Sequence, residues 1–190
     1  MKTPILPRDR RAFSLVELLV VLALLGLLTS LAIPAFQSAR SASSLSSAGQ
    51  MVVAELNFAR QTALSRGFAV QVRFYQLPGY GEDRMAPPSA YRAIQSFSID
   101  GAVTNALDKA TFFPPPARAS VDPAASPLLQ TAETGSYRLP EVGINYRYAP
   151  LLFNPDGSLD SAVSTNAFLT LVLDRAPIRA GNLPANFVKQ

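Results

Sequence analysis

The stretch FSLVELLVVLALLGLLTSLAIP, residues 13–34, decides how the rest of the sequence is interpreted. Glu17 is its only charged residue, and no residue from Leu18 to Ala39 carries a charge. About twenty such residues are enough for a helix to cross the hydrocarbon core of a bilayer. Basic residues precede the stretch, so we expect them to stay in the cytoplasm and the remaining chain to lie across the membrane. These residues are Lys2, Arg8, Arg10 and Arg11.

Three simpler interpretations of this stretch compete. It could be a cleaved secretory signal with Ser30-Leu31-Ala32 as the cut site, a plain transmembrane anchor, or a buried core helix. The basic flank and the apolar length argue against a core helix. The other two leave Glu17 unexplained, because a carboxylate costs about 2.5–3.5 kcal/mol at a bilayer centre and less near the interface. Glu17 is therefore a candidate functional residue whose partner is missing.

Composition narrows the function classes. The 190 residues suffice for one globular domain plus an extra element. The net charge of +4 arises mostly before Phe13, since thirteen basic and twelve acidic residues follow, and so gives no argument for a nucleic-acid partner. The sequence has no His and no Cys, which removes the usual general base, the thiol nucleophile and common metal ligands. We expect no enzymatic activity, no metal and no cofactor.

A helical repeat continues beyond the apolar stretch. Apolar residues recur every three or four positions, which predicts an amphipathic helix, and Arg66-Gly67 is a plausible stop. A helix from about Ser14 to Arg66 would be roughly 80 Å long. No domain of this size buries such a helix, so we expect its first half to protrude into lipid or among other subunits. The stripe comprises Leu45, Ala48, Val52, Leu56, Ala59 and Ala63.

After Gly67 the pattern changes to the alternation of strands. Residues 68–75 and 91–99 are the clearest strands, and 144–148, 151–153 and 167–173 supply shorter ones. Long loops rich in proline are expected at 77–89 and 113–127. The prediction is an α+β fold in which antiparallel strands pack on the carboxyl-terminal half of one long helix.

Two polar segments are weaker candidates for chemistry. Residues 154–160, NPDGSLD, space their carboxylates like a calcium loop but lack a distal bidentate Glu, and Pro-Asp-Gly favours a hairpin turn. Residues 82–84, Glu-Asp-Arg, are expected to be solvated, with a partner contact as the alternative.

The amino-terminal residues carry a family resemblance. Arg10-Arg11-Ala12 followed by FSLVELLVV resembles the prepilin cleavage and methylation motif of type IV pilins and type II secretion pseudopilins. The resemblance implies that a prepilin peptidase cuts between Ala12 and Phe13 and methylates the new amine of Phe13. Glu17 then takes the place of the family's glutamate, the fifth residue after the cut. Ala12 departs from the glycine that the family prefers before the cut.

The resemblance also gives the segment an assembly role. Cleavage creates an amine cation near apolar surroundings, where an unpaired charge is costly, and Glu17 of a neighbouring subunit is expected to supply the counter-charge. Gly26 and Pro34 fall where the family often has helix-loosening residues. Pro34 removes a backbone donor, so a bend or local melting is expected there. The alternative is that Gly26 and Pro34 are incidental residues of a membrane helix.

Downstream motifs resemble narrower families. Residues 56–63, LNFARQTA, and FNPDGS at 153–158 resemble the minor pseudopilin class. VRFY at 72–75, YRAIQ at 91–95, FNPDGS and LPANF at 183–187 together resemble the Verru_Chthon cassette protein D family. That resemblance implies another strand after Phe187, whereas the sequence ends at Gln190, so we expect this strand to be truncated or diverged.

The sequence thus predicts a basic leader at 1–12, a transmembrane and assembly half-helix at 13–39, a packed half-helix at 40–66 and a β-rich domain at 67–190. We expect a single-pass subunit of the bacterial inner membrane, with a periplasmic carboxyl-terminal domain, that joins an extracytoplasmic filament. Its expected partners are the prepilin peptidase, other pilin or pseudopilin subunits, the assembly platform and membrane lipid. The rival interpretations are a membrane-anchored periplasmic binding module that does not polymerise and a secreted enzyme.

Overall fold

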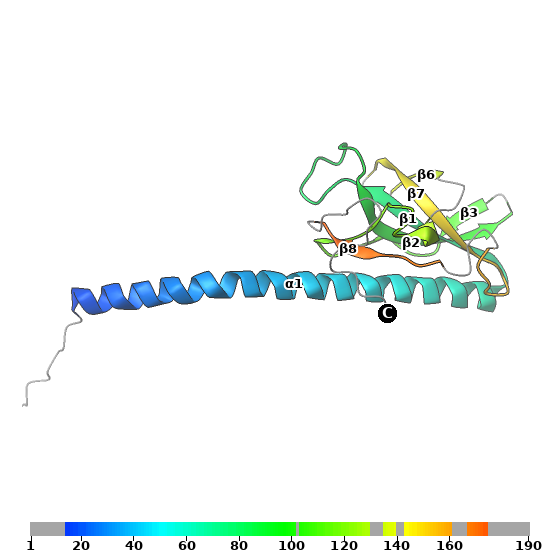
Figure 1. Cartoon of the computed structure of the whole chain (residues 1–190). Coiled ribbons are helices and arrows are strands. Elements are labelled where there is room, and N and C mark those ends of the chain that lie inside the picture. The colour runs from blue at the N-terminus through cyan, green and yellow to red at the C-terminus, as the bar shows by residue number, and fades with distance from the viewer. Residues whose placement is uncertain (1–13, 102, 130–134, 140–142, 161–166, 175–190) are drawn as a thin grey trace, which may run out of the picture. The chain divides into compact units, whose positions relative to one another are not determined.

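The computed structural model describes residues 14–101, 103–129, 135–139, 143–160 and 167–174. The chain divides into two compact units, Met1–Arg40 and Ser41–Gln190, and each is considered by itself. Figure 1 shows the elements of both units in chain order. The leader at 1–12, the residue Phe13 and the segment around Phe187 lie outside the described residues.

A single helix, α1 (Leu15–Arg66), contributes to both units. Its start is capped by Ser14, whose Oγ accepts a hydrogen bond from the backbone N–H of Val16 at 3.3 Å. Its end follows the predicted pattern, because Gly67 adopts a positive φ of 69° and donates its N–H to the carbonyl of Ala63 at 2.9 Å. The predicted helix from Ser14 to Arg66 is confirmed to within one residue.

The described strands form one antiparallel sheet, and a short 3₁₀ turn, η1 (Pro127–Leu129), precedes β6. The central path runs β6-β7-β1-β2-β5-β8, and β3 and β4 pair with β2 outside this path. Two long strands at its centre, β1 and β2, pair from Ala69↔Ile99 to Leu77↔Ala90. The strands are β1 (Ala69–Leu77), β2 (Ala90–Asp100), β3 (Val103–Ala106), β4 (Thr111–Phe112), β5 (Ala117–Ala119), β6 (Gly135–Arg138), β7 (Asn145–Phe153) and β8 (Leu171–Leu173).

The strands predicted at 68–75 and 91–99 correspond to β1 and β2, and the loop predicted at 77–89 separates them. The two strands predicted at 144–148 and 151–153 are one, because β7 continues through Pro150. Proline fits here because β6 pairs with β7 only as far as Tyr148. Among the described strands Pro150 therefore has a neighbour on one side only, β1, and the missing N–H of proline breaks no pairing on the other side. The segment at 113–127, predicted to be a loop, contains the short strand β5.

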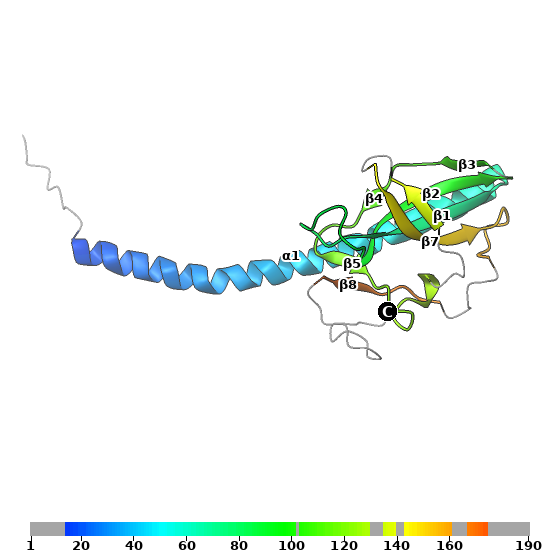
Figure 2. The same cartoon turned by 90° about the horizontal axis from the view of Figure 1, so that it is seen from above.

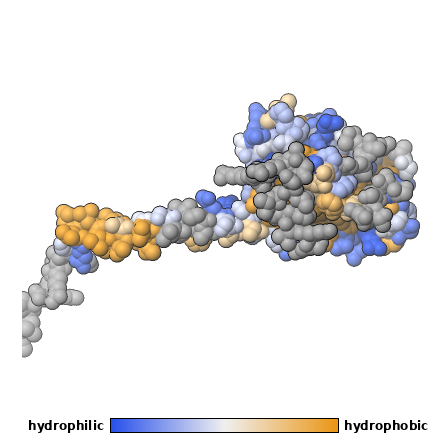
Figure 3. Space-filling model, viewed as in Figure 1, coloured by the Kyte–Doolittle hydropathy of each residue, from blue (hydrophilic) through white to orange (hydrophobic). Residues whose placement is uncertain are grey.

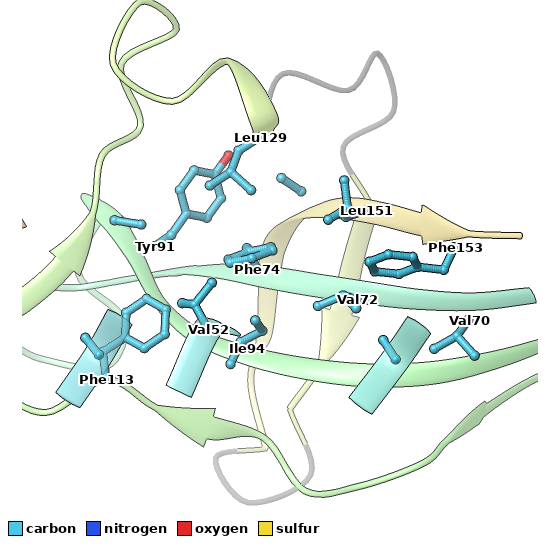
Figure 4. Packing of buried hydrophobic residues seen from close by; sticks show 14 of the residues in the cluster. Val52, Val70, Val72, Phe74, Tyr91, Ile94, Phe113, Leu129, Leu151 and Phe153 are labelled. Atoms are coloured by element: carbon cyan, nitrogen blue, oxygen red, sulfur yellow. The ribbon is translucent and has the colours of Figure 1, made fainter. Parts of the chain in front are cut away.

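The main core lies between the sheet and the part of α1 in the second unit, as Figures 1 and 2 show. All six residues of the predicted stripe take part in it: Ala48, Val52, Ala59 and Ala63 are buried, and Leu45 and Leu56 pack against them partly buried. Across from them β1, β2 and β7 contribute large side chains, and Figure 4 shows these spread along the sheet from Ile94 beside Val52 to Val70 and Phe153 at the other end. Each such buried side chain stabilises the fold by about 1.5–3 kcal/mol. These are Val70, Val72, Phe74, Ile94, Leu151 and Phe153.

A second cluster covers the opposite face of the sheet. Tyr75, Phe97, Leu139 and Tyr146 are buried there with partly buried tyrosines around them. Arg73 shares this face, 5% exposed, with its guanidinium carbon 4.0 Å from the centre of the Phe97 ring. Both faces of β1 and β2 are therefore buried.

Candidate functional site: the amino-terminal part of α1

The first turn of α1 contains Glu17, the predicted assembly residue. Ser14 caps the helix and Glu17 lies three residues later in the first turn, where the helix dipole favours a negative charge. Glu17 is exposed, and no basic side chain among the described residues forms an ion pair with it. The order Ser-x-x-Glu is also the pattern of a capping box. Glu17 is therefore placed where its charge favours the helix start through the dipole, which the sequence prediction did not consider.

Apolar side chains cover this part of α1 on every side. From Leu15 to Leu28 they range from 46% exposed at Val21 to 75% exposed at Leu15. Figure 3 shows them as a continuous orange surface on the face in view. Apolar surface of this extent marks a site that contacts a membrane or another protein. The described residues of the chain leave it uncovered.

The few polar side chains on this surface are satisfied within the helix. The Thr29 hydroxyl donates to the carbonyl of Leu25 at 2.9 Å and lies 3.0 Å from that of Gly26. The Ser30 hydroxyl donates to the carbonyl of Leu27 at 2.8 Å. Such bonds remove the cost of placing a hydroxyl in apolar surroundings. These bonds could have been expected from the sequence, because Thr and Ser hydroxyls can donate to backbone carbonyls of the preceding helical turn.

The other predicted site residues fall in two groups. Gly26 and Pro34 both lie inside α1, which continues through them, and a Cβ at Gly26 would meet no atom within 4 Å. Arg10, Arg11, Ala12 and Phe13 lie outside the described residues. Among the residues that are described, no helix combines the length and the hydropathy required to cross a membrane.

The segment at 154–160 forms the predicted turn. Phe153 bridges Leu159, and the Asn154 N–H donates to the Ser158 carbonyl at 2.8 Å. Asp156 accepts hydrogen bonds from the Ser158 hydroxyl and N–H, which lower the pKa of its carboxyl. Gly157 has a φ of 75°, and a Cβ there would come within 2.8 Å of Leu64 on α1. The Asp156 carboxylate thus shapes a turn that lies against Leu64 near the end of α1.

The loop at 82–84 is exposed, as predicted, and its side chains bond to the loop itself. Glu82 Oε2 accepts from the Gly79 N–H at 2.7 Å, and Asp83 Oδ1 accepts from the Met85 N–H at 2.9 Å. The Arg84 carbonyl accepts a hydrogen bond from the Tyr146 hydroxyl at 3.1 Å, which ties the loop to β7.

One cluster of charged residues was not foreseen. Arg92 and Arg118 converge on Asp174: Arg92 Nη2 donates to Asp174 Oδ1 at 2.8 Å, and Arg118 Nε lies 3.1 Å from the same oxygen. Arg92 is 3% exposed and stacks 4.6 Å from the centre of the Tyr80 ring. Burial lowers the pKa of Arg118, and the positive charge of Arg92 lowers it further while Asp174 opposes both. The cluster ties β2, β5 and the residue after β8 together, and the Asp174 carboxylate at its centre is paired with two guanidinium groups.

Within the described residues no group of three or more acidic residues is arranged to hold a metal ion. In a comparison with known families, residues 7–33 match the prokaryotic N-terminal methylation motif. The match supports a pilin-type or pseudopilin-type protein whose precursor a prepilin peptidase processes. Neither the curated proteins nor the solved structures contain a significant match to the chain.

Proposed function

We propose that the chain is a pilin-like structural subunit, of the pseudopilin or minor pilin kind, that joins a filament related to type IV pili or type II secretion systems. The observation that carries the proposal is the coincidence of the methylation motif at 7–33 with the exposed apolar surface of α1. The motifs downstream of residue 56 in the chain favour a minor or initiating subunit, and they favour membership of the Verru_Chthon cassette protein D family.

In this proposal the apolar part of α1 is first covered by lipid and later by other subunits. The uncharged run from Leu18 to Ala39 anchors the subunit in the inner membrane in a single pass, with residues 67–190 in the periplasm. The prepilin peptidase removes the leader after Ala12 and methylates Phe13. The assembly platform then passes the subunit into the filament, where neighbouring apolar helices replace lipid around it. Gly26 and Pro34 loosen α1 during this transfer.

Glu17 has a specific electrostatic task in this transfer. The amine created at Phe13 lies two residues before Leu15, the first residue of α1, so its positive charge meets the positive end of the helix dipole. Glu17 in the first turn carries the opposite charge. A Glu17 carboxylate from the next subunit offsets the amine once water is excluded, because an unpaired charge in that setting is strongly destabilising.

Two variants separate the charge of Glu17 from its role in capping. Glu17→Gln keeps the residue size and the capping-box pattern and removes the charge, whereas Glu17→Asp keeps the charge. In a strain with the peptidase and the platform, we expect Glu17→Gln to insert into the membrane normally and to lose at least about tenfold in incorporation into assemblies. Glu17→Asp retains part of the incorporation. Ser14→Ala, which removes the cap alone, is the control.

Mass spectrometry of the mature amino terminus tests the processing step directly. The expected product begins with a methylated Phe13. An intact leader, or a cut near Ala32, would favour the rival function of an anchored binding module that does not polymerise. Crosslinking followed by identification of membrane partners names the machine, and normal incorporation of Glu17→Gln would overturn the role given to its charge.

A further inference from the structure

A second acidic residue of α1, Glu55, lies on the packed face of the helix. It follows buried Val52 by three residues and precedes buried Ala59 by four, so it shares their side of α1. The side chain is half-buried, and its carboxylate accepts a hydrogen bond from the hydroxyl of Ser96 on β2. A carboxyl group thus sits in the contact between helix and sheet.

Asp108 reaches the same place from the connection between β3 and β4. Its Oδ1 accepts the backbone N–H of Ser96 at 3.0 Å, and its carbonyl accepts a hydrogen bond from Gln95 Nε2 at 2.9 Å. β3 pairs with residues 97–100 of β2 and β4 pairs with residues 93–94, so Ser96 falls between the two. The Asp108 carboxylate therefore fills a break in the ladder of β2.

The two carboxyl groups meet at Ser96. Burial, a hydrogen bond between the Glu55 and Asp108 side chains and the charge of Asp108 together raise the pKa of Glu55 to about 7, although the bond from Ser96 opposes them. Asp108 is the charged group facing Glu55 from the sheet side, and Ser96 faces it from β2 without a charge. Two adjacent carboxyl groups, with no ion pair to either among the described residues, favour a state in which they share one proton.

We propose that Glu55, Asp108 and Ser96 form a proton-operated latch between α1 and the sheet. The latch is closed while the carboxyl pair holds a proton, because one carboxyl then donates a hydrogen bond to the other. It loosens when both are ionised, because two negative charges then repel each other across the contact. The segment from Leu107 to Ala110 between β3 and β4 is the part released, since Asp108 holds it against β2.

The sign of the pH effect follows from the folded state binding the proton more tightly than the unfolded chain. Glu55 loses its proton near its ordinary pKa of 4.5 when unfolded and near 7 when folded. Protonation of Glu55 contributes its full stabilisation of the fold below pH 4.5. This contribution falls as the pH rises between 4.5 and about 7 and is absent above about pH 7. The side chain is half-buried, so solvent screens part of the effect. We expect the unfolding equilibrium constant to rise by about ten- to a hundredfold across this window.

Tyrosine signals make the experiment selective for the second unit. All six tyrosines lie after residue 40 and there is no tryptophan, so near-ultraviolet circular dichroism of the full chain in nonionic detergent reports on the unit that contains the latch. Urea unfolding is measured at intervals from pH 5 to 8. Hydrogen exchange at the Ser96 amide, corrected for intrinsic rates, reports the local opening because that N–H bonds to Asp108.

Two variants and one control decide the outcome. Glu55→Gln fixes the neutral form and therefore flattens the pH dependence of unfolding and of Ser96 exchange between pH 5 and 8. Asp108→Asn removes the repulsion but leaves Glu55 buried, so it makes both dependences shallower without abolishing them. Asp100→Asn removes an exposed carboxylate at the end of β2 and leaves the dependence as in the unmodified chain. If Glu55→Gln does not fold, Asp108→Asn alone decides. A flat profile in the unmodified chain, or a profile that neither variant changes, overturns the proposal.

Discussion

The two parts of α1 form one continuous helix, but their apolar side chains lie in opposite surroundings, exposed in the first part and packed against the sheet in the second. From Leu15 to Leu28 apolar side chains point in every direction and are all exposed. From Leu45 to Ala63 one stripe of apolar side chains, half of them alanine, is covered by β1, β2 and β7, whereas Val53 and Phe58 lie off the stripe and are exposed. The second part is stabilised by packing inside its own unit, whereas the first part depends on apolar surroundings that the described chain does not supply. Length and helical form alone therefore do not indicate what a helix does.

The largest expected effect comes from placing a charge on the packed stripe. Ala59 is fully buried against the sheet, so Ala59→Glu forces an unpaired carboxylate into the core or separates helix from sheet. We expect a loss of about 3–5 kcal/mol in the free energy of unfolding, measured by urea titration of the tyrosine signal. Ala54→Glu, at an exposed position of the same helix, is the matched control and should change stability by less than about 0.5 kcal/mol. Similar losses for both would remove the distinction between the faces.

A glutamate introduced into the amino-terminal part of α1 is expected not to change the free energy of unfolding. Leu22 is 58% exposed, so Leu22→Glu is expected to leave tyrosine-monitored unfolding unchanged. It should weaken membrane insertion by about 2.5–3.5 kcal/mol, because it adds a carboxylate to the uncharged run. Membrane fractionation and alkaline extraction measure this loss, with Leu22→Met as the control. Full membrane retention of Leu22→Glu would contradict the role proposed for this surface.

The smallest effect concerns the end of the packed part. Gly157 has a positive φ and faces Leu64, so Gly157→Ala combines backbone strain with a clash. We expect a loss of about 1–2 kcal/mol in the free energy of unfolding. The same substitution in a Leu64→Ala background removes the clash and keeps the strain, so it should cost less there. An equal cost in both backgrounds would show that the turn does not press on the helix.

The main elements could be predicted because their sequence patterns are local. The stripe from Leu45 to Ala63 has helical spacing, and β1 alternates apolar and polar residues, so each shows its period directly. The short strands β3 to β6 were missed because each has two to four residues and exists through pairing with β2 or β7. The break assumed at Pro150 was wrong because whether proline fits a strand depends on which neighbours the strand has.

Prediction of functional groups was limited in the same way. Glu17 could be singled out because a charge beside an uncharged run is visible in the sequence, and its role in assembly stays a prediction. Glu55 was missed although its spacing from Val52 and Ala59 already places a carboxyl on the packed face. No sequence pattern indicates that Asp108, 53 residues later by its number, meets it, because that contact depends on how β3 and β4 leave β2. The cluster of Arg92, Arg118 and Asp174 was hidden for the same reason.

The hydroxyls of Thr29 and Ser30 have a consequence for the energetics of exchange between surroundings. Their hydrogen bonds go to carbonyls of α1 itself, so exchanging lipid for protein around this part makes and breaks no hydrogen bond at either residue. On the proposed function, the barrier to leaving the bilayer then depends on van der Waals contacts, which both surroundings offer, and on the ionised groups at the helix start. The free energy of this part of α1 therefore differs little between lipid and a protein filament. The difference that remains comes mainly from the electrostatics of the ionised groups at the helix start.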